Sequence, residues 1–416
     1  MIIKIPKGTQ DILPEDINKW YYVEDVIRNI LKKYDYKEIR TPIFEHTELF
    51  IRGIGESTDI VNKEMFTFPD RKGRSLTLRP EGTASVVRSY LENRMDRTSK
   101  VVKLYYFGPM FRCEKPQAGR FRQFNQFGIE SIGSQSPVAD AEIIAAALEI
   151  YEKLGLKNLK VSLNSVGCKK CRVAYIERLR LFLDKKEAQL CHDCKQRTFK
   201  NPLRVLDCKK ESCQEALKNA PKIIDHLCEE CRLHFKEVKA LLDHLKIDYV
   251  IDDKLVRGLD YYTKTAFEIA SGELGAQNAI AGGGRYDNLV DELGGKETPA
   301  VGFAAGIERM IITMEKQNLP WPEPTAFDVF LVNTDEKKKS IALTLLQKIR
   351  KSGFTADMDI SGKSLKSQMR TANKVQAKYT VILGEEELSR EKVTVRNMES
   401  KEQKEVDIDN IIKTLL

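Results

Sequence analysis

A basic, aromatic-rich stretch from residue 105 to residue 130 carries side chains suited to binding a phosphate-containing ligand. Its pattern predicts two strands joined by a polar loop that holds Pro116 and Gly119. Arg112 and Arg120 stand near the two ends of this loop, and the planar donors of arginine match the oxygens of a phosphate group. The stretch therefore predicts a ligand-binding hairpin. An exposed hairpin whose charges are simply solvated is the alternative.

Alternation along the two strands indicates which side chains share a face. We assume that the strands pair antiparallel with Gly108 opposite Gly128. Both glycines then lie on one face, because successive side chains of a strand point to opposite sides. A glutamine and a glutamate above a glycine floor have little use in packing, so this face is predicted to hold a polar ligand. The same face carries Arg112, Phe124, Gln126 and Glu130.

Two further segments place polar groups where expected strands end or turn. Glu81 follows a strand and precedes Thr83, which is suited to begin a helix. The Glu81 carboxylate could bind an ammonium group or cap that helix, and both interpretations stay open. Arg257 lies at an expected turn before Tyr261 and Tyr262, where a cation and two hydroxyl groups can surround a small polar ligand. A solvent-exposed arginine beside packed tyrosines is the alternative.

A glycine run and a strand-to-helix segment add further candidates. Residues 279–290, AIAGGGRYDNLV, predict a strand entering a triple-glycine bend, with Arg285 and Tyr286 just beyond it. The run has neither the lysine of a Walker loop nor the spacing of a dinucleotide-binding loop, so it predicts close backbone approach. Residues 299–310 predict a strand followed by a helix, with Arg309 about one turn inside, where cation and helix N-terminus can face an anion.

The sequence has nine cysteines, which is an odd number. Six of them form three CxxC pairs within a lysine-rich stretch from residue 167 to residue 245 that is expected to be helical. The stretch predicts an inserted domain, because a sheet pattern resumes after it. Two CxxC pairs can complete a tetrahedral zinc site, and such a zinc would be structural. Plain buried cysteines are the alternative, and three pairs leave the choice of ligands open. The preferred zinc ligands are Cys191, Cys194, Cys228 and Cys231.

Composition is typical of a soluble globular protein with two or three domains: of 416 residues, 42% are hydrophobic and 31% are charged. No apolar run approaches the length of a membrane span, and the first ten residues lack the apolar core of a secretion signal. These features predict a cytoplasmic protein without a membrane partner. The net charge of +8 permits a polyanionic partner but does not identify one.

The expected elements divide the chain into domains. A helix is predicted from Pro14 to about residue 34, followed by a strand over 37–49 that Pro42 interrupts. The proline-rich segment 319–325 is the clearest linker, and strands and helices alternate beyond it. The predicted domains are residues 1–320, an insertion at 167–245 within them, and an α/β domain at 325–416.

Five segments carry a resemblance: LVRGLDYY at 255–262, AGGGRYDNLV at 281–290, LRPEGTA at 78–84, the hairpin at 105–130 and GFAAGIERM at 302–310. Together they resemble the bacterial-type histidyl-tRNA synthetases, which are class II aminoacyl-tRNA synthetases, in the right order over nearly the whole chain. LVRGLDYY is the most specific of them. The hairpin resembles class II motif 2, the strand-to-helix segment resembles motif 3, and the strand with Pro42 resembles motif 1 at the dimer interface.

The resemblance implies an α+β fold: a mostly antiparallel catalytic sheet flanked by helices, a helical Cys-rich insertion and a C-terminal anticodon-binding domain. It also implies a homodimer that joins L-histidine to histidine tRNA. In the first step histidine attacks the α-phosphate of ATP, with Mg²⁺ on the phosphates, giving histidyl-adenylate and pyrophosphate. In the second step the histidyl group passes to the terminal adenosine of the tRNA.

The same resemblance assigns roles to residues of this sequence. The three tyrosines would line an imidazole pocket, and Glu81 and Thr83 would hold the α-amino end of histidine. Arg112 and Arg257 would be the catalytic cations at the α-phosphate, and Phe124 would stack on adenine. The expected histidine-binding residues are Glu81, Gly82, Thr83, Gln126, Glu130, Tyr261, Tyr262 and Tyr286. The expected ATP-binding residues are Arg112, Arg120, Phe124, Arg257 and Arg309.

Two positions depart from the common pattern of these synthetases. Cys113 stands where most members have an aromatic residue or histidine, and Asn125 stands where histidine is common. Alternation directs Asn125 away from the glycine face, so the departures predict a tuned hairpin rather than lost activity.

Two other functions fit parts of the sequence. One is a catalytically silent paralogue resembling the regulatory subunit of ATP phosphoribosyltransferase, and the other is a zinc-dependent nucleic-acid-binding protein. Such paralogues tend to lose the catalytic arginines and the C-terminal domain, which this chain has. A candidate nucleic-acid face, for which simple solvation is the alternative, comprises Lys363, Lys366, Arg370, Lys374 and Lys378.

Overall fold

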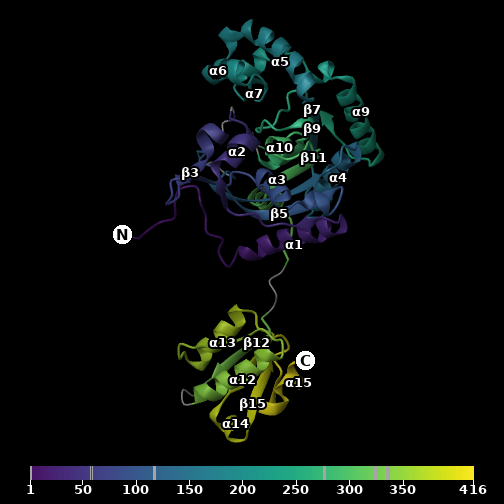
Figure 1. The fold of residues 1–416 in the computed structure, drawn as a ribbon. Coiled ribbons are helices and arrows are strands. Elements are labelled where there is room, and N and C mark those ends of the chain that lie inside the picture. Colours follow the sequence, from purple (N-terminus) through teal and green to yellow (C-terminus); the bar gives the residue numbers. More distant parts are fainter. Residues whose placement is uncertain are drawn as a thin grey trace. The chain divides into compact units, whose positions relative to one another are not determined.

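The structure, a computed structural model, describes residues 2–56, 58, 60–115, 119–274, 278–322, 327–333 and 338–416. The chain divides into two units, Met1–Pro322 and Glu323–Leu416 (Figure 1). Two predicted features fall partly outside the described residues: Pro116 of the hairpin loop and positions 323–325 of the linker. Among the residues that are described, no helix is both long and apolar enough to cross a membrane.

A large sheet forms the centre of the first unit (Figure 1). It has eight strands in the order β1-β5-β6-β11-β10-β9-β7-β8. Its outermost pairs, β1 with β5 and β7 with β8, are parallel, and every pair between them is antiparallel. The predicted mostly antiparallel catalytic sheet is therefore confirmed. The strands are β1 Lys37–Glu38, β5 Val102–Phe111, β6 Gln123–Ile132, β7 Leu159–Ser165, β8 Val250–Ile251, β9 Thr263–Ser271, β10 Ala279–Arg285 and β11 Ala300–Gly306.

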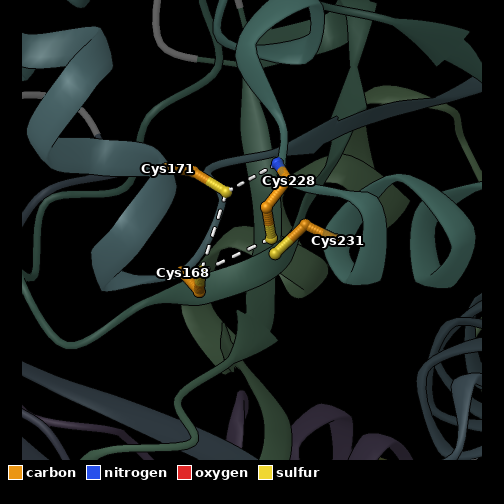
Figure 2. Close-up of side chains that lie close together, drawn as sticks. All are labelled: Cys168, Cys171, Cys228 and Cys231. Carbon is orange, nitrogen blue, oxygen red and sulfur yellow. Dashed lines mark hydrogen bonds between the residues drawn. The ribbon is translucent and has the colours of Figure 1, made fainter.

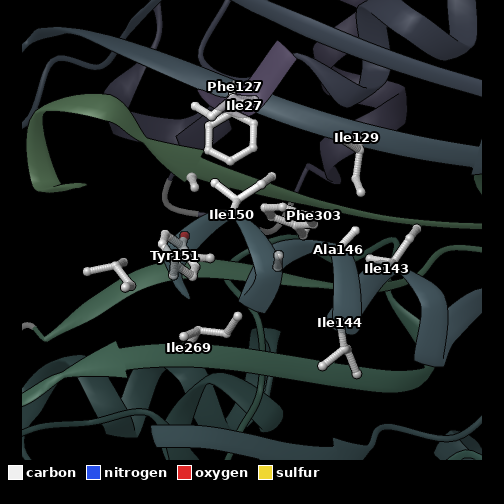
Figure 3. Close-up of a cluster of buried hydrophobic side chains, with 14 of the residues drawn as sticks. Ile27, Phe127, Ile129, Ile143, Ile144, Ala146, Ile150, Tyr151, Ile269 and Phe303 are labelled. Carbon is white, nitrogen blue, oxygen red and sulfur yellow. The ribbon is translucent and has the colours of Figure 1, made fainter. Parts of the chain in front are cut away.

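Helices α1, α4 and α11 cover one face of this sheet and share the main hydrophobic core with it. Figure 3 shows Phe127 and Phe303 of the strands lying against Ile150 of α4 and Ile27 of α1. Each such side chain contributes about 1.5–3 kcal/mol when fully buried. The helix predicted from Pro14 begins three residues later, after a turn. The bounds are α1 Ile17–Lys33, α4 Pro137–Lys153 and α11 Ile307–Lys316.

The opposite face of the sheet packs on α3 (Thr83–Glu92) and α10 (Leu289–Glu292). A second, smaller cluster joins Val86 of α3 to Tyr106 and Met110 of β5. Because even-numbered residues of β5 and β6 face this side, the glycine face of the predicted hairpin lies here.

The strand predicted over 37–49 is not continuous. It is divided into β1, a loop holding Pro42, the short strand β2 and the start of helix α2. Proline cannot donate to a strand ladder, and the Arg79 side chain instead donates to the carbonyl oxygens of Thr41 and Pro42. β2 joins a separate sheet in the order β2-β4-β3. The bounds are β2 Phe44–His46, α2 Thr47–Ile54, β3 Phe66–Pro69 and β4 Ser75–Leu78.

The segment between β7 and β8 is helical, as its sequence predicts, and has a hydrophobic cluster of its own. Its first helix follows β7 directly, and its last helix leads back to β8, so both ends of the segment meet the main sheet. The helices are α5 Lys169–Asp184, α6 His192–Lys200, α7 Leu203–Leu206, α8 Glu211–Ala216 and α9 Glu229–His244.

The second unit contains a five-stranded sheet in the order β13-β12-β14-β15-β16, parallel in its first three strands and antiparallel in the rest. Two elements were not predicted: helix α14 and the polar edge strand β16. The strands are β12 Val329–Asn333, β13 Ala356–Met358, β14 Tyr379–Leu383, β15 Lys392–Asn397 and β16 Gln403–Asp407. The helices are α12 Lys339–Lys351, α13 Leu365–Lys374, α14 Glu385–Ser389 and α15 Ile411–Leu415.

Candidate active site

The hairpin of β5 and β6 has a different register from the one assumed. Gly108 lies opposite Gln126 and Tyr106 lies opposite Gly128, so the assumed pairing of Gly108 with Gly128 is wrong by two residues. A displacement by an even number leaves every side chain on its face. The predicted set of face residues is therefore unchanged.

A cavity of about 70 Å³ opens on this face of the sheet. It brings together residues that are far apart in the chain, from α3, β6, β10, β11 and the loop before β9. Eight of its lining residues belong to the sets predicted from the sequence: Glu81, Thr83, Arg112, Gln126, Arg257, Tyr261, Tyr262 and Tyr286. The others, which sequence reasoning missed, are Leu259, Gly282, Gly302, Phe303 and Ala304.

The capping interpretation of Glu81 is confirmed, and its binding of an ammonium group stays a prediction. Its carboxylate accepts hydrogen bonds from the backbone N–H groups of Thr83, at 2.7 Å, and Ala84, at 2.9 Å, at the start of α3. It thereby caps the helix and also lines the cavity. Burial raises the pKa of Glu81, and the hydrogen bonds from Ala84 and Thr83 oppose that rise.

Glu130 is fully buried and is hydrogen-bonded to two residues that line the cavity. Its Oε1 accepts a hydrogen bond of 2.7 Å from the Thr83 hydroxyl, and its Oε2 accepts one from the Tyr286 hydroxyl. Burial raises the pKa of Glu130 to about 8, although both hydrogen bonds favour the ionised form. A side chain at Gly302 would place its Cβ 1.9 Å from Oε2, so glycine is required there.

Three tyrosines form one wall of the cavity. The ring centroid of Tyr261 lies 4.9 Å from that of Tyr262 and 5.6 Å from that of Tyr286. Burial raises the pKa of all three, so their hydroxyl groups stay protonated at neutral pH. Beside them, the Tyr106 hydroxyl and Gln126 Oε1 are buried without a hydrogen-bond partner among the described residues. Such groups are suited to receive a polar ligand.

Tyr106 was not predicted as a site residue. Its ring fills the space above two glycines, because a Cβ at Gly82 or Gly128 would lie within 2.4 Å of it. The signal in the sequence was the pair of glycines on the hairpin face and in the loop before α3, which together leave room for one large ring.

Arg257 lines the same cavity. Its Nη1 donates to Glu268 Oε2 at 2.7 Å, and its Nε has no hydrogen-bond partner among the described residues. A Cβ at Gly282 would stand 1.8 Å from Arg257 Nη2. The glycine run is part of strand β10 and not the predicted bend. Glycine is needed at these positions because neighbouring atoms leave no room for a side chain.

The remaining predicted cations lie around the hairpin. Arg112 donates from Nε to the Pro80 carbonyl oxygen at 3.1 Å, and its guanidinium group lies 5.4 Å from the Phe124 ring centroid. Arg120 donates to Glu114 at 2.6 Å, and Arg309 donates to the Ala279 carbonyl oxygen at 2.6 Å. Burial lowers the pKa of Arg309, and the positive charge of Arg120 adds to this effect. The two carboxylates that hold these cations, Glu114 and Glu268, were not predicted.

The two departures from the family pattern leave the cavity intact. Cys113 is exposed, and its backbone N–H donates to the Glu64 carbonyl oxygen at 2.7 Å. Asn125 is directed to α11, where its backbone N–H and its amide nitrogen donate to Glu308 Oε1 at 2.7 Å and 3.2 Å. Neither residue lines the cavity.

Arg285, next to Tyr286, has a structural environment. It is fully buried, and its Nε lies 2.8 Å from Asp140 Oδ2. Asp140 in turn lies 3.2 Å from His234 Nε2 of α9. This buried network ties the end of β10 to α4 and α9.

The cysteines of the insertion form two groups of four, and the predicted zinc set is wrong. Figure 2 shows Cys228 and Cys231 beside Cys168 and Cys171. The two CxxC pairs of the predicted set belong to different groups. Cys228 and Cys231 lie where the insertion joins the main sheet, whereas Cys191 and Cys194 lie within the insertion. The second group comprises Cys191, Cys194, Cys208 and Cys213.

Comparison with known proteins agrees with the resemblance seen in the sequence. A family profile described as Histidyl-tRNA synthetase matches residues 8–310, and one described as Anticodon binding domain matches residues 328–416. A histidine–tRNA ligase of Halothermothrix orenii is 53% identical over 415 residues, covering 100% of this chain and 99% of the relative. One of Desulforamulus reducens is 50% identical over 412 residues, covering 99% and 98%.

Among solved structures, the crystal structure of apo histidyl-tRNA synthetase from S. aureus is 40% identical, with a TM-score of 0.83 and coverage of 100% of both chains. Sequence and fold thus agree over the whole length, through both the catalytic sheet and the C-terminal unit. The chain belongs to the histidyl-tRNA synthetase family.

Proposed function

We propose that this protein ligates L-histidine to histidine tRNA, with ATP as the energy source and histidyl-adenylate as the intermediate. AMP and pyrophosphate are released. The observation that carries the proposal is a cavity on the glycine face of the sheet. There the buried Glu81 carboxylate and three tyrosines meet two arginines, the groups needed for an amino acid and a phosphate. A second buried carboxylate, Glu130, is hydrogen-bonded to the lining residues Thr83 and Tyr286. Full-length identity of about half to histidine–tRNA ligases supports it.

The carboxylate side of the cavity binds histidine. Glu81 and Glu130 supply negative charge for the α-ammonium group, and Thr83 and Gln126 add hydrogen-bond partners. The three tyrosines surround the imidazole ring, whose nitrogen atoms can pair with their hydroxyl groups. Apolar analogues are rejected because they leave such buried polar groups unpaired.

The arginine side of the cavity binds ATP. Arg112 and Arg257 contact the α-phosphate, where negative charge grows as the carboxylate of histidine attacks and pyrophosphate leaves. Phe124 and Arg309 hold the adenine ring between them, and Arg120 contacts the outer phosphates. Class II synthetases use ATP with Mg²⁺, which offsets the charge of the leaving pyrophosphate.

The silent paralogue is the competing proposal. A silent paralogue is expected to have lost catalytic arginines. Arg112, Arg257 and Arg309 are present here, and each side chain donates a hydrogen bond to an acceptor within the protein. The presence of the C-terminal unit also favours the synthetase.

Three further features belong to the same proposal. The C-terminal unit binds the anticodon region of the tRNA, using the cations on and around α13. Two chains form a homodimer through the motif 1 region, where Ile43, Phe44 and Phe68 are exposed apolar side chains. The cysteines of the insertion bind structural zinc.

ATP–pyrophosphate exchange with each of the twenty amino acids tests the proposal without tRNA. Exchange with histidine alone is the expected result, since adenylation is reversible and the pocket selects the amino acid. A folded protein that supports exchange with no amino acid would contradict the proposal and favour the silent paralogue.

A further inference from the structure

We propose that the insertion binds two structural zinc ions, each through four cysteines, and that one of them fixes the backbone behind the histidine pocket. The link to the pocket rests on the proposed function, whereas the metal sites do not depend on it. The neck site comprises Cys168, Cys171, Cys228 and Cys231, where the insertion joins the main sheet. The distal site comprises Cys191, Cys194, Cys208 and Cys213, within the insertion.

The spacing of sulfur atoms in the neck site fits a tetrahedral zinc ion. Cys168 Sγ lies 3.7 Å from Cys171 Sγ and 3.8 Å from Cys228 Sγ, and all four sulfur atoms lie within 4.8 Å of one another (Figure 2). Zinc bound at about 2.3 Å by four thiolates separates them by about 3.8 Å. All four cysteines are free of disulfide bonds. The sulfur atoms therefore stand where a zinc site made of four thiolates needs them.

The backbone around the neck site favours thiolates. Cys168 and Cys228 each stand directly before a helix, α5 and α9, whose N-terminal dipole stabilises negative charge. The backbone N–H of Cys228 donates to Cys171 Sγ at 3.1 Å. Gly167 adopts φ +65°, and a Cβ there would lie 2.6 Å from the Cβ of Cys171. Glycine at 167 thus leaves room for Cys171 to lie against the turn that precedes Cys168.

The distal site repeats this arrangement without using a second CxxC pair. Cys191 precedes α6 and Cys194 lies in its first turn, as in the neck site. Their partners are Cys208, just after α7, and Cys213 of α8. The backbone N–H of Cys191 donates to Cys213 Sγ at 3.2 Å. A metal there would join three short helices, which have too few residues to be stable alone.

Plain buried thiols do not explain this pattern. A cysteine that serves only as a small apolar side chain needs no particular neighbour. Here eight of the nine cysteines form two separate groups of four, and the ninth, Cys113, is exposed in the hairpin. Clustering of this kind favours a shared ligand.

Arg172 connects the neck site to the histidine pocket. It follows Cys171 in the first turn of α5, and its guanidinium group donates to the carbonyl oxygens of Asp260, at 3.2 Å, and Tyr262. These carbonyl groups belong to the loop that carries Tyr261 and Tyr262 into the cavity. A metal that fixes the first turn of α5 therefore also fixes the backbone of the pocket.

A second contact reaches the same place from α9. Glu230, beside Cys231, lies 2.8 Å from Lys264 Nζ at the start of β9. Asn201, which follows α6, also reaches this loop through a side-chain hydrogen bond of 2.8 Å to Asp260. Arg172 and Glu230 are each next in sequence to a cysteine of the neck site, whereas Asn201 is not adjacent to a cysteine of the distal site. Loss of the neck metal is therefore expected to affect histidine binding more than loss of the distal metal.

Elemental analysis of the full-length protein, purified under reducing conditions, tests the metal sites. Two zinc ions per chain are expected, and X-ray absorption should show four sulfur ligands at about 2.3 Å. Cys171→Ser and Cys213→Ser should each reduce the content to about one. Because a cysteine variant can fail to fold, titration of the wild-type protein with a mercurial reagent gives a second measurement, with two zinc ions released. A content of one or none overturns the two-site proposal.

Arg172→Ala tests the link to the pocket, with Arg180→Ala as the matched control on the same helix. Arg180 donates to the Phe199 carbonyl oxygen and makes no hydrogen bond or ion pair with the described residues of the loop before β9. Arg172→Ala should retain two zinc ions but raise the KM for histidine about tenfold or more, with little change in the KM for ATP. The control should match the wild-type protein.

An unchanged KM for histidine in Arg172→Ala would overturn the link, even with both metals present. Failure of the proposed function would look different, because the wild-type protein would then show no histidine-dependent exchange while its zinc content stayed the same.

Discussion

The two sides of the active-site cavity are built on different principles. On the histidine side, Glu81 and Glu130 are buried and bound to groups of the protein next to them, the start of α3 and the Tyr286 hydroxyl. On the arginine side, Arg257 and Arg120 are partly exposed and are paired with carboxylates. The two carboxylates of one side are held by protein groups without a ligand, whereas the two arginines of the other side are held by ion pairs that a phosphate can replace.

This difference predicts a different role for each side of the cavity. We expect a phosphate to replace these carboxylates as partner of the arginines, because Glu268 and Glu114 remain partly exposed, at 27% and 20%, and the phosphates of ATP carry more negative charge than one carboxylate. We therefore expect the arginines to stabilise the negative charge that develops at the α-phosphate during the reaction. The buried carboxylates cannot exchange partners in this way, so we expect them to set the selectivity and the pH dependence of histidine binding instead.

The largest effect is expected from Arg257→Ala. Removing a preorganised cation at the α-phosphate should lower the rate of histidine-dependent ATP–pyrophosphate exchange by more than ~100-fold. Circular dichroism should show an unchanged fold, because Arg257 packs against glycine rather than filling the core. A variant that exchanges pyrophosphate at a near-normal rate would remove Arg257 from the catalytic role.

Gly282→Ala should displace Arg257 without removing it. The new Cβ would lie 1.8 Å from Nη2, and the end of a flexible side chain moves more easily than the strand. A shift on the scale of 1 Å predicts a loss of exchange rate of about 10- to 100-fold. Gly272→Ala is the matched control, since nothing lies within 4 Å of its added Cβ. Equal activity of the two variants would show that the position of Arg257 is not critical.

Much of the fold follows from local signals in the sequence. Ser136 and Pro137 mark the start of α4, and the apolar run before Gly306 marks β11 ahead of α11. Strand β16 was missed because its polar residues lie on an exposed edge and show no apolar alternation. Alternation also fixed which face of the hairpin carries Gln126 and Glu130, but it could not distinguish registers that differ by two.

The partners of the site residues required the tertiary structure. Nothing near Arg257 in the sequence indicates Glu268 as its acceptor, because the two meet only when the loop folds back on β9. Counting CxxC pairs likewise overlooked Cys208 and Cys213, whose spacing is wider. Local patterns name the reactive groups of this protein, while the packing of distant segments decides which groups meet.

Glu130→Gln should change how histidine binding depends on pH. Below the pKa of about 8, Glu130 is protonated in the free protein. The histidine ammonium group favours the ionised form, so binding should release up to about one proton near pH 7, and affinity should rise with pH toward 8. Glutamine carries no such proton. The affinity of the Glu130→Gln variant for histidine should therefore change less over this pH range. Titration of the free histidine ligand affects the variant and the wild-type protein equally.

Calorimetry of histidine binding, in two buffers of different ionisation enthalpy, measures the released proton directly. Glu308→Gln is the control, because Glu308 is also a buried carboxylate with a raised pKa but binds Asn125 away from the cavity. It should release as many protons as the wild-type protein. Equal release from Glu130→Gln and the wild type would show that Glu130 does not respond to the ammonium group. The proposed contrast is that a carboxylate of the histidine side changes its protonation state while the arginines exchange ion-pair partners. That contrast would then be wrong for Glu130, which is fully buried.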